Sequence, residues 1–129
     1  MKEMEYKYLA NNEQFHEILD RGTYNGYEYC IILFGSHPCA YVVIPEDNPL
    51  YKKNYYDMDI DVHCGLTFGD TNRFIDDKWC IGWDYAHAGD YSSYYILFND
   101  GLAESSKKWT TAEILEDVHH VIDQLPKQA

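Results

Sequence analysis

Two segments decide how this chain folds: Met58-Asp-Ile-Asp-Val-His-Cys-Gly-Leu-Thr-Phe-Gly69 and Trp79-Cys-Ile-Gly-Trp-Asp-Tyr-Ala-His-Ala-Gly-Asp-Tyr91. Apolar and polar residues alternate in both segments, as they do in a β-strand whose two faces meet different surroundings. In the first segment, isoleucine and valine share one face while aspartates and a histidine share the other. We therefore predict strands over Asp57–Cys64 and Trp79–Tyr85, the second with a heavily aromatic face.

Four other segments carry secondary-structure signals. Tyr27–Phe34, which is apolar on both faces from Cys30 onward, and Cys39–Ile44 are predicted to be buried strands. The short connection Gly35–Pro38 predicts that they form an antiparallel hairpin at the centre of the sheet. Tyr94–Phe98 is predicted to be the last strand. Asn11–Gly22 has the pattern of a short helix, because its first asparagine can cap it and its apolar residues recur at helical spacing.

The segment after Trp109 carries the strongest helix signal. Thr110 and Glu113 form a Thr-x-x-Glu capping box, Trp109 can pack back onto the first turn, and Pro126 marks the end. An apolar stripe predicts the face that packs on the sheet: Ile114, Leu115, Val118, Val121, Ile122 and Leu125. The predicted fold is α+β, a single domain over residues 1–129. A mostly antiparallel sheet of about five or six strands carries the C-terminal amphipathic helix and the short N-terminal helix.

The composition excludes several classes of function. The chain has 22 acidic and 10 basic residues, and nucleic-acid-binding proteins need a basic surface, so we predict no direct contact with nucleic acid. No apolar run approaches the ~18–20 residues of a membrane helix, and Met1–Lys7 lacks the apolar core of a signal peptide. The four cysteines include no Cys-x-x-Cys pair. We therefore expect a cytoplasmic protein without membrane contact and without a cofactor.

Polar residues collect at the ends of the two segments quoted above. Glycines beside them allow a ligand to come close to the backbone, and aromatic residues offer stacking surfaces. These features are typical of a small-molecule pocket or a protein interface. We predict a ligand-binding site built from His63, Thr67, Trp83, Asp84, His87, Asp90 and Tyr91.

The same residues leave other functions open. A shell of His63, Asp84, His87 and Asp90 could hold a transition metal, which would make the protein a metal-dependent hydrolase. However, the chain contains no Gly-x-Ser-x-Gly elbow, phosphate-binding glycine loop or His-Glu-x-x-His motif, and Cys64 is predicted on the strand face opposite His63. We expect a protein that binds rather than catalyses, assign no catalytic residue and no metal, and keep the hydrolase as the alternative. In a third interpretation the polar groups only brace the loops.

Two motifs resemble those of a known group of proteins. His63-Cys-Gly-Leu-Thr67 and Gly82-Trp-Asp-Tyr-Ala-His-Ala-Gly-Asp90 look like the pattern His-Gly-Gly-Leu-Thr, then Gly-Phe-Asp-x-Ala-His-x-Gly-Asp, of small uncharacterised phage, prophage and gut-bacterial proteins. The likeness covers residues 40–91 and the tail helix. The chain departs from this pattern at Cys64, where the group tends to have glycine, and at Tyr85, where it tends to have cysteine. Both departures argue against a metal-ligand role for a cysteine.

The resemblance implies an accessory protein of a mobile element that counters host defence stoichiometrically. Such a protein blocks a host protein or sequesters a small nucleotide-like ligand. The net charge of −12 favours the first version, because a phosphate needs cationic or backbone N–H donors, although Lys52, Lys53, Arg73 and Lys78 could supply a few. An aromatic content of 16% also predicts association, most simply as a homodimer.

Overall fold

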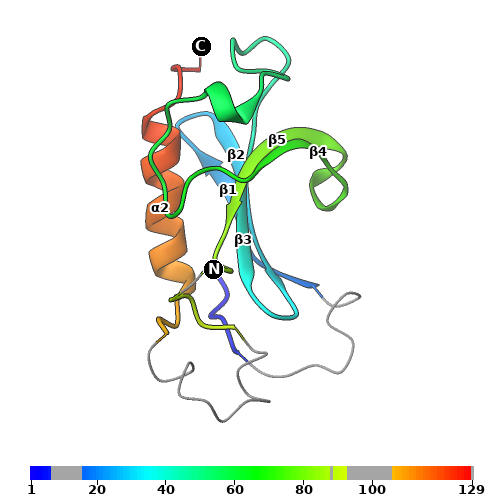
Figure 1. Cartoon of the computed structure of the whole chain (residues 1–129). Coiled ribbons are helices and arrows are strands. Elements are labelled where there is room, and N and C mark those ends of the chain that lie inside the picture. Colours follow the sequence, from blue (N-terminus) through cyan, green and yellow to red (C-terminus); the bar gives the residue numbers. More distant parts are fainter. Residues whose placement is uncertain (7–15, 88, 93–105, 129) are drawn as a thin grey trace.

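The computed structural model describes residues 1–6, 16–87, 89–92 and 106–128. Within them, five strands form one antiparallel sheet with the order β1-β2-β3-β5-β4. The strands are β1 (His16–Tyr24), β2 (Tyr27–Phe34), β3 (Pro38–Val43), β4 (Phe68–Asn72) and β5 (Lys78–Asp84). The helix α2 (Thr111–Asp123) lies along one face of the sheet, and two 3-10 turns, η2 (Tyr55–Asp57) and η3 (Arg73–Ile75), lie in the connections (Figure 1). The architecture is α+β, as predicted.

The centre of the sheet consists of β2 and β3, which are apolar on both faces except at Glu28. These strands pair antiparallel, with Tyr29 opposite Val42, which confirms the predicted hairpin. On its other edge β3 pairs with β5, so that Ala40 lies opposite Trp83. Every residue of β3 is buried, as expected for a strand that has neighbours on both edges and cover on both faces.

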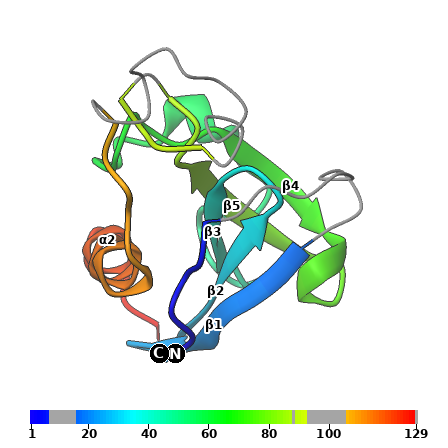
Figure 2. The same ribbon diagram turned by 90° about the horizontal axis from the view of Figure 1, so that it is seen from below.

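The larger core lies between the sheet and α2, which Figure 2 shows along one side of the curved sheet. Its largest fully buried side chains include Trp83, Tyr27 and Tyr85. The aromatic face predicted for β5 therefore packs under the helix. The sheet and helix residues of this core include Leu19, Ile31, Val42, Trp79, Ile81, Trp83, Ile114, Val118, Val121 and Ile122.

A smaller core covers the opposite face of the sheet. Ile75 of η3 closes over it, and three of the four cysteines lie there beside Tyr41. Burial raises the pKa of Cys30 to about 11 and the pKa values of Cys39 and Cys80 to about 12. These three thiols therefore stay protonated at neutral pH and behave as small hydrophobic side chains.

The short N-terminal helix predicted over Asn11–Gly22 is wrong where the structure describes it, because His16–Tyr24 form β1. This strand pairs with β2 from His16 to Tyr24, with a register shift between Ile18 and Asp20. The chain then turns tightly through Asn25 and Gly26, with φ angles of 48° and 83°. Backbone pairing in the sheet overrides the local helical pattern, which came from a few apolar residues. The first part of the predicted helix lies outside the described residues.

The strand predicted over Asp57–Cys64 is also wrong, because this segment has no strand pairing. Ile60 and Val62 still pack partly buried against the larger core, so the alternation reflects burial rather than a sheet ladder. Two side chains at the C-terminal end of α2 hold the segment instead. The His120 ring lies 3.2 Å from the Asp61 carboxylate, and the C-cap residue Gln124 binds the Asp61 backbone. The amide of Gln124 accepts the backbone N–H of Asp61 at 2.7 Å and donates to its carbonyl at 2.7 Å.

The helix α2 begins as the sequence predicts. The Thr110 hydroxyl accepts the backbone N–H of Glu113 at 3.2 Å, and the Glu113 carboxylate accepts the backbone N–H of Thr110 at 3.0 Å. The predicted last strand, Tyr94–Phe98, lies outside the described residues. In the described part of the chain, no helix combines the length and the apolar character needed to span a membrane.

Candidate functional site

Most of the predicted site residues meet where β5 ends and the chain turns toward the N-terminal end of α2 (Figure 1). Asp84 is the last residue of β5, and the turn after it carries His87 and Asp90. Asp90 forms a parallel bridge with Lys107, in the segment that leads into α2. We call the group formed by His63, Asp84, His87, Asp90 and Trp109 the histidine cluster.

Asp90 is the centre of the histidine cluster, and its side chain is only 3% exposed. Its carboxylate lies 2.9 Å from His63 Nε2, accepts the indole N–H of Trp109 at 2.9 Å and accepts the backbone N–H of His87 at 3.1 Å. A buried carboxylate is stable when hydrogen-bond donors surround it, and here three segments supply them. Asp90 therefore holds the proton of neutral His63 on Nε2 and leaves Nδ1 as the other ring nitrogen.

The ring of His63 forms a triangle with two aromatic rings, Tyr85 and Trp109, whose own centroids lie 4.9 Å apart. Tyr85 stacks on it with 5.1 Å between centroids and 7° between planes, and Trp109 lies 4.8 Å away. The Tyr85 hydroxyl donates to Asp117 of α2 at 2.7 Å and accepts the indole N–H of Trp83 at 2.9 Å. Burial, and then the bond to Asp117, raises the pKa of Tyr85 far above its usual value, so this hydroxyl keeps its proton. His63 is therefore fixed in both position and orientation.

Asp84 organises the other half of the cluster. It accepts the Thr67 hydroxyl at 2.9 Å and the backbone N–H of Ala86 at 3.1 Å. His87 Nε2 lies 3.1 Å from the same carboxylate, but the directions of the groups do not make this contact a hydrogen bond. This buried ring nitrogen consequently has no hydrogen-bond partner among the described residues.

Two of the predicted site residues lie in packed surroundings. Trp83 is 1% exposed and belongs to the larger core under α2, while Tyr91 is 5% exposed. The Tyr6 ring meets Tyr91 edge-on, with 5.0 Å between centroids, and the Tyr6 hydroxyl donates to the carbonyl of Trp109 at 3.2 Å. The structure thus joins His63, Thr67, Asp84, His87 and Asp90 through direct contacts, and places Trp83 and Tyr91 behind them.

Sequence reasoning missed Trp109 as a member of the site. A tryptophan directly before a helix cap predicts packing on the first turn. No residue pattern near Trp109 in the sequence indicates its bond to Asp90. Two lysines accompany it: Lys107 Nζ lies 3.9 Å from the centre of the Trp109 ring, and Lys108 Nζ lies 4.6 Å from that of Tyr91. Lys107 also pairs with Glu113 at 2.7 Å. The acidic chain therefore has a small basic and aromatic border beside the cluster.

Cys64 does not have the surroundings of a catalytic nucleophile. Its sulfur lies 3.7 Å from His63 Nε2, which is the nitrogen already bonded to Asp90, so His63 has no free base directed at the thiol. Desolvation, and then the negative charges of Asp90 and Asp84, raises the pKa of the Cys64 thiol. Catalytic cysteines show the opposite shift.

The raised pKa of Cys64 predicts slow alkylation. Because the thiolate is the reactive form, the rate of reaction with iodoacetamide should rise with pH and reach its midpoint above about 8.5, the value for a free cysteine. Mass spectrometry should count one modified cysteine in the folded protein and four after unfolding in urea, because three of the four are buried. A midpoint below that of free cysteine would contradict this prediction and indicate an activated thiol.

The described residues do not offer a metal centre. No group of three or more His, Cys, Asp or Glu side chains in the described ranges is arranged so that it could hold a metal ion. Asp90 is bonded to three donors, and Asp84 to a hydroxyl and a backbone N–H. The cluster is thus built from mutual hydrogen bonds and stacked rings.

Comparisons with protein-family models, with curated proteins and with solved structures found no match for this chain. The resemblance carried by His63–Thr67 and Gly82–Asp90 therefore stays a prediction. The geometry nevertheless relates these two motifs to each other, because the first residue of one lies 2.9 Å from the last residue of the other. They form a single structural unit.

Proposed function

We propose that this protein is a stoichiometric binding protein that holds one small nucleotide-like ligand at the histidine cluster. The observation that carries this proposal is the buried His87 Nε2, which makes no hydrogen bond with any described residue. A buried polar atom without a hydrogen bond costs about 1–3 kcal/mol, and native proteins keep few of them. A ligand that bonds to this nitrogen would remove the cost.

The groups near His87 suit an anionic ligand with an aromatic part. His63 can present Nδ1, and the Lys108 amine, which forms no ion pair with a described residue, lies over Tyr91. Phosphate oxygens accept strong hydrogen bonds from ammonium groups, and a nucleobase can donate to the Nδ1 of His63 and stack on the half-buried ring of Trp109. The net charge of −12 suits a basic protein surface, which makes blocking a host protein the second candidate.

The geometry of the cluster supports ligand binding better than it supports catalysis. The Nε2 of His63 is engaged by Asp90, and a thiol with a raised pKa is a weak nucleophile. A hydrolase that uses His63, Asp84, His87 and Asp90 would also need a metal or an activated water. It stays the alternative, and the experiment below separates the two.

We further propose that the protein acts in the bacterial cytoplasm as an accessory factor of a phage or another mobile element, which removes a signal that host defence needs. Two features support this proposal. The paired motifs His63–Thr67 and Gly82–Asp90 resemble those of phage and prophage proteins, and none of the four cysteines forms a disulfide, as is usual in a reducing compartment.

The test is native mass spectrometry of the protein after incubation with small molecules extracted from bacteria. We expect one adduct of a few hundred daltons per subunit, and the same spectrum reports whether the protein is a homodimer. His87→Gln should weaken binding of the recovered ligand at least about tenfold, the effect of losing one charge-assisted hydrogen bond. His16→Gln is the matched control, because His16 is exposed and lies on β1.

The outcomes separate the candidates. An adduct that forms equally well with His87→Gln would contradict the proposed site. A ligand released with altered mass would establish turnover and favour the hydrolase. A protein that gains no adduct, but captures a basic host protein in a His87-dependent way, would favour the second candidate. If His87→Gln only lowers stability, the cluster braces the loops.

A further inference from the structure

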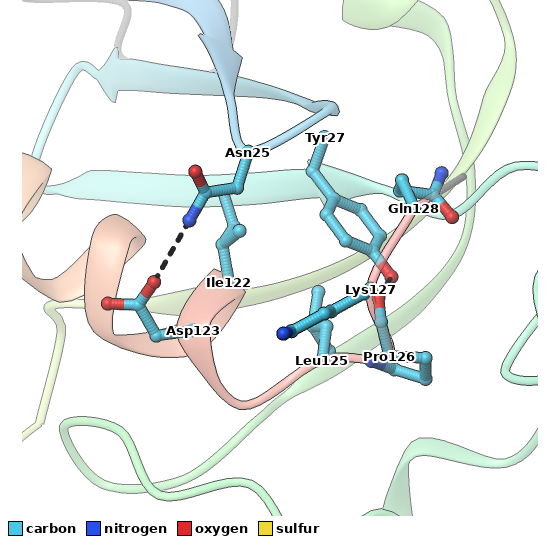
Figure 3. Close-up of a pocket in the computed structure, with 8 residues that line it drawn as sticks. All are labelled: Asn25, Tyr27, Ile122, Asp123, Leu125, Pro126, Lys127 and Gln128. Atoms are coloured by element: carbon cyan, nitrogen blue, oxygen red, sulfur yellow. Dashed lines mark hydrogen bonds between the residues drawn. The ribbon is translucent and has the colours of Figure 1, made fainter.

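A cavity of about 450 Å³ lies at the opposite end of α2 from the histidine cluster (Figure 3). The helix has 13 residues, so the two places are about 20 Å apart along its axis. The turn after β1, the start of β2 and the segment that follows α2 form its walls. Its lining consists of Asn25, Tyr27, Ile122, Asp123, Leu125, Pro126, Lys127 and Gln128.

Two opposite charges line this cavity without pairing. Asp123 accepts hydrogen bonds from the Tyr24 hydroxyl at 3.1 Å and from the Asn25 side-chain amide at 3.2 Å, both of which are neutral donors. Figure 3 shows the amine of Lys127 directed into the same cavity, and it forms no ion pair with a described residue. The cavity therefore presents one carboxylate and one ammonium group, each with capacity for a partner of opposite charge.

The C-terminal end of α2 adds to the negative potential around Asp123. Asp123 is the last residue of the helix, where the macrodipole places partial negative charge that favours a cation. Between the two charges the wall is apolar and includes Leu125 and Pro126. A ligand suited to this arrangement has a positive group, a negative group and a small apolar part.

The walls of the cavity are connected by one buried and two partly buried hydrogen bonds. The Tyr27 hydroxyl donates to the carbonyl of Pro126 and accepts the side-chain amide of Asn48 at 2.7 Å. The same amide of Asn48 donates to the side chain of Gln128 at 3.2 Å. The segment after α2 is thereby attached to β2 and to the loop after β3. The cavity is a preformed feature of the fold, which lowers the entropy cost of binding.

We propose that this cavity binds a free apolar α-amino acid. Its ammonium group bonds to Asp123 at the negative end of α2, its carboxylate bonds to Lys127, and its side chain packs on Leu125 and Pro126. The volume lies within the range of small-molecule sites. This site is separate from the histidine cluster and does not depend on the function proposed there.

The test is isothermal titration calorimetry of the full chain with L-leucine and two of its derivatives. N-acetyl-L-leucine lacks the positive charge, and L-leucinamide lacks the negative one. We expect L-leucine to bind at one site per chain and each derivative to bind at least about tenfold more weakly, because each loses one charge-assisted contact. Asp123→Asn and Lys127→Gln should each weaken L-leucine binding by a similar factor, with circular dichroism showing that both variants fold.

The matched controls are Glu46→Gln and Lys52→Gln. These residues line a second cavity of about 490 Å³ beside Trp79, so their substitution removes the same charges from a cavity of similar size. Both controls, and His87→Gln, should bind L-leucine like the unchanged protein. The proposal is overturned if L-leucine does not bind at millimolar concentration, if both derivatives bind as well as L-leucine, or if the controls weaken binding while Asp123→Asn and Lys127→Gln do not.

Discussion

Replacing Asp90 with alanine is expected to lower the free energy of unfolding by about 3–5 kcal/mol, the usual effect of removing one partner from a buried charged network. The side chain is 3% exposed and faces His63 Nε2, the Trp109 indole N–H and the backbone N–H of His87. All three donors lose their acceptor. Urea unfolding followed by circular dichroism measures the change.

Two variants make this measurement specific. Asp90→Asn keeps the shape and one acceptor oxygen, so its loss should be smaller, about 1–3 kcal/mol. Asp59→Ala removes an exposed carboxylate and should change stability by less than about 0.5 kcal/mol. If Asp90→Ala were no more destabilising than Asp59→Ala, the carboxylate would not be the centre of the cluster.

The second large effect is expected for Trp83→Ala, which should cost about 3–5 kcal/mol because it leaves a cavity in the larger core. Trp83 is 1% exposed, and its indole N–H donates to the Tyr85 hydroxyl at 2.9 Å. The substitution removes both the packing and this bond. Thermal or urea unfolding, with fluorescence from the remaining tryptophans, gives the magnitude.

Trp83→Phe distinguishes a core residue from a ligand-contacting one. It should cost less than alanine because the ring still fills most of the space. Because Trp83 lies behind the cluster, affinity for the ligand proposed to bind there should stay within about twofold. A large loss of affinity with little loss of stability would show instead that the indole contacts the ligand directly.

The elements that the sequence predicted well are those whose signals are local. Cys30–Phe34 and Cys39–Ile44 are apolar throughout and are separated by a short turn, so a central hairpin is the simplest way to bury both. The capping box at Thr110 contains both of its partners within one helical turn. Such patterns determine the structure before any distant part of the chain is known.

The elements predicted wrongly depend on distant partners. β1 is a strand because its backbone pairs with the edge of β2. The sequence of His16–Tyr24 contains no signal of that distant partner. The segment Asp57–Cys64 alternates because Ile60 and Val62 reach the core, yet Gln124 rather than a strand binds its backbone. Alternation of apolar and polar residues shows that one side of an extended segment is buried. It does not show that the segment pairs in a sheet, because an unpaired extended segment can bury one side in the same way.

The candidate site shows the same difference between local signals and contacts with distant segments. Residue type and glycine context selected His63, Asp84, His87 and Asp90 from the sequence. The bond of Asp90 to Trp109, and the His87 nitrogen that makes no hydrogen bond with a described residue, required coordinates, because they depend on how three separate segments approach one another. Trp83 was assigned to the same site, although a strand directs alternate side chains to opposite faces and this one enters the core.

The position of Asp90 between segments far apart in the chain has a consequence during synthesis. One of its donors precedes it by 27 residues and another follows it by 19 residues. A nascent chain that ends before Trp109 lacks one of these donors, and contacts over such separations form after local ones. Ribosome-bound intermediates can therefore assemble the central hairpin while the histidine cluster is incomplete. The protein should gain binding capacity only after α2 has been translated and has docked on the sheet.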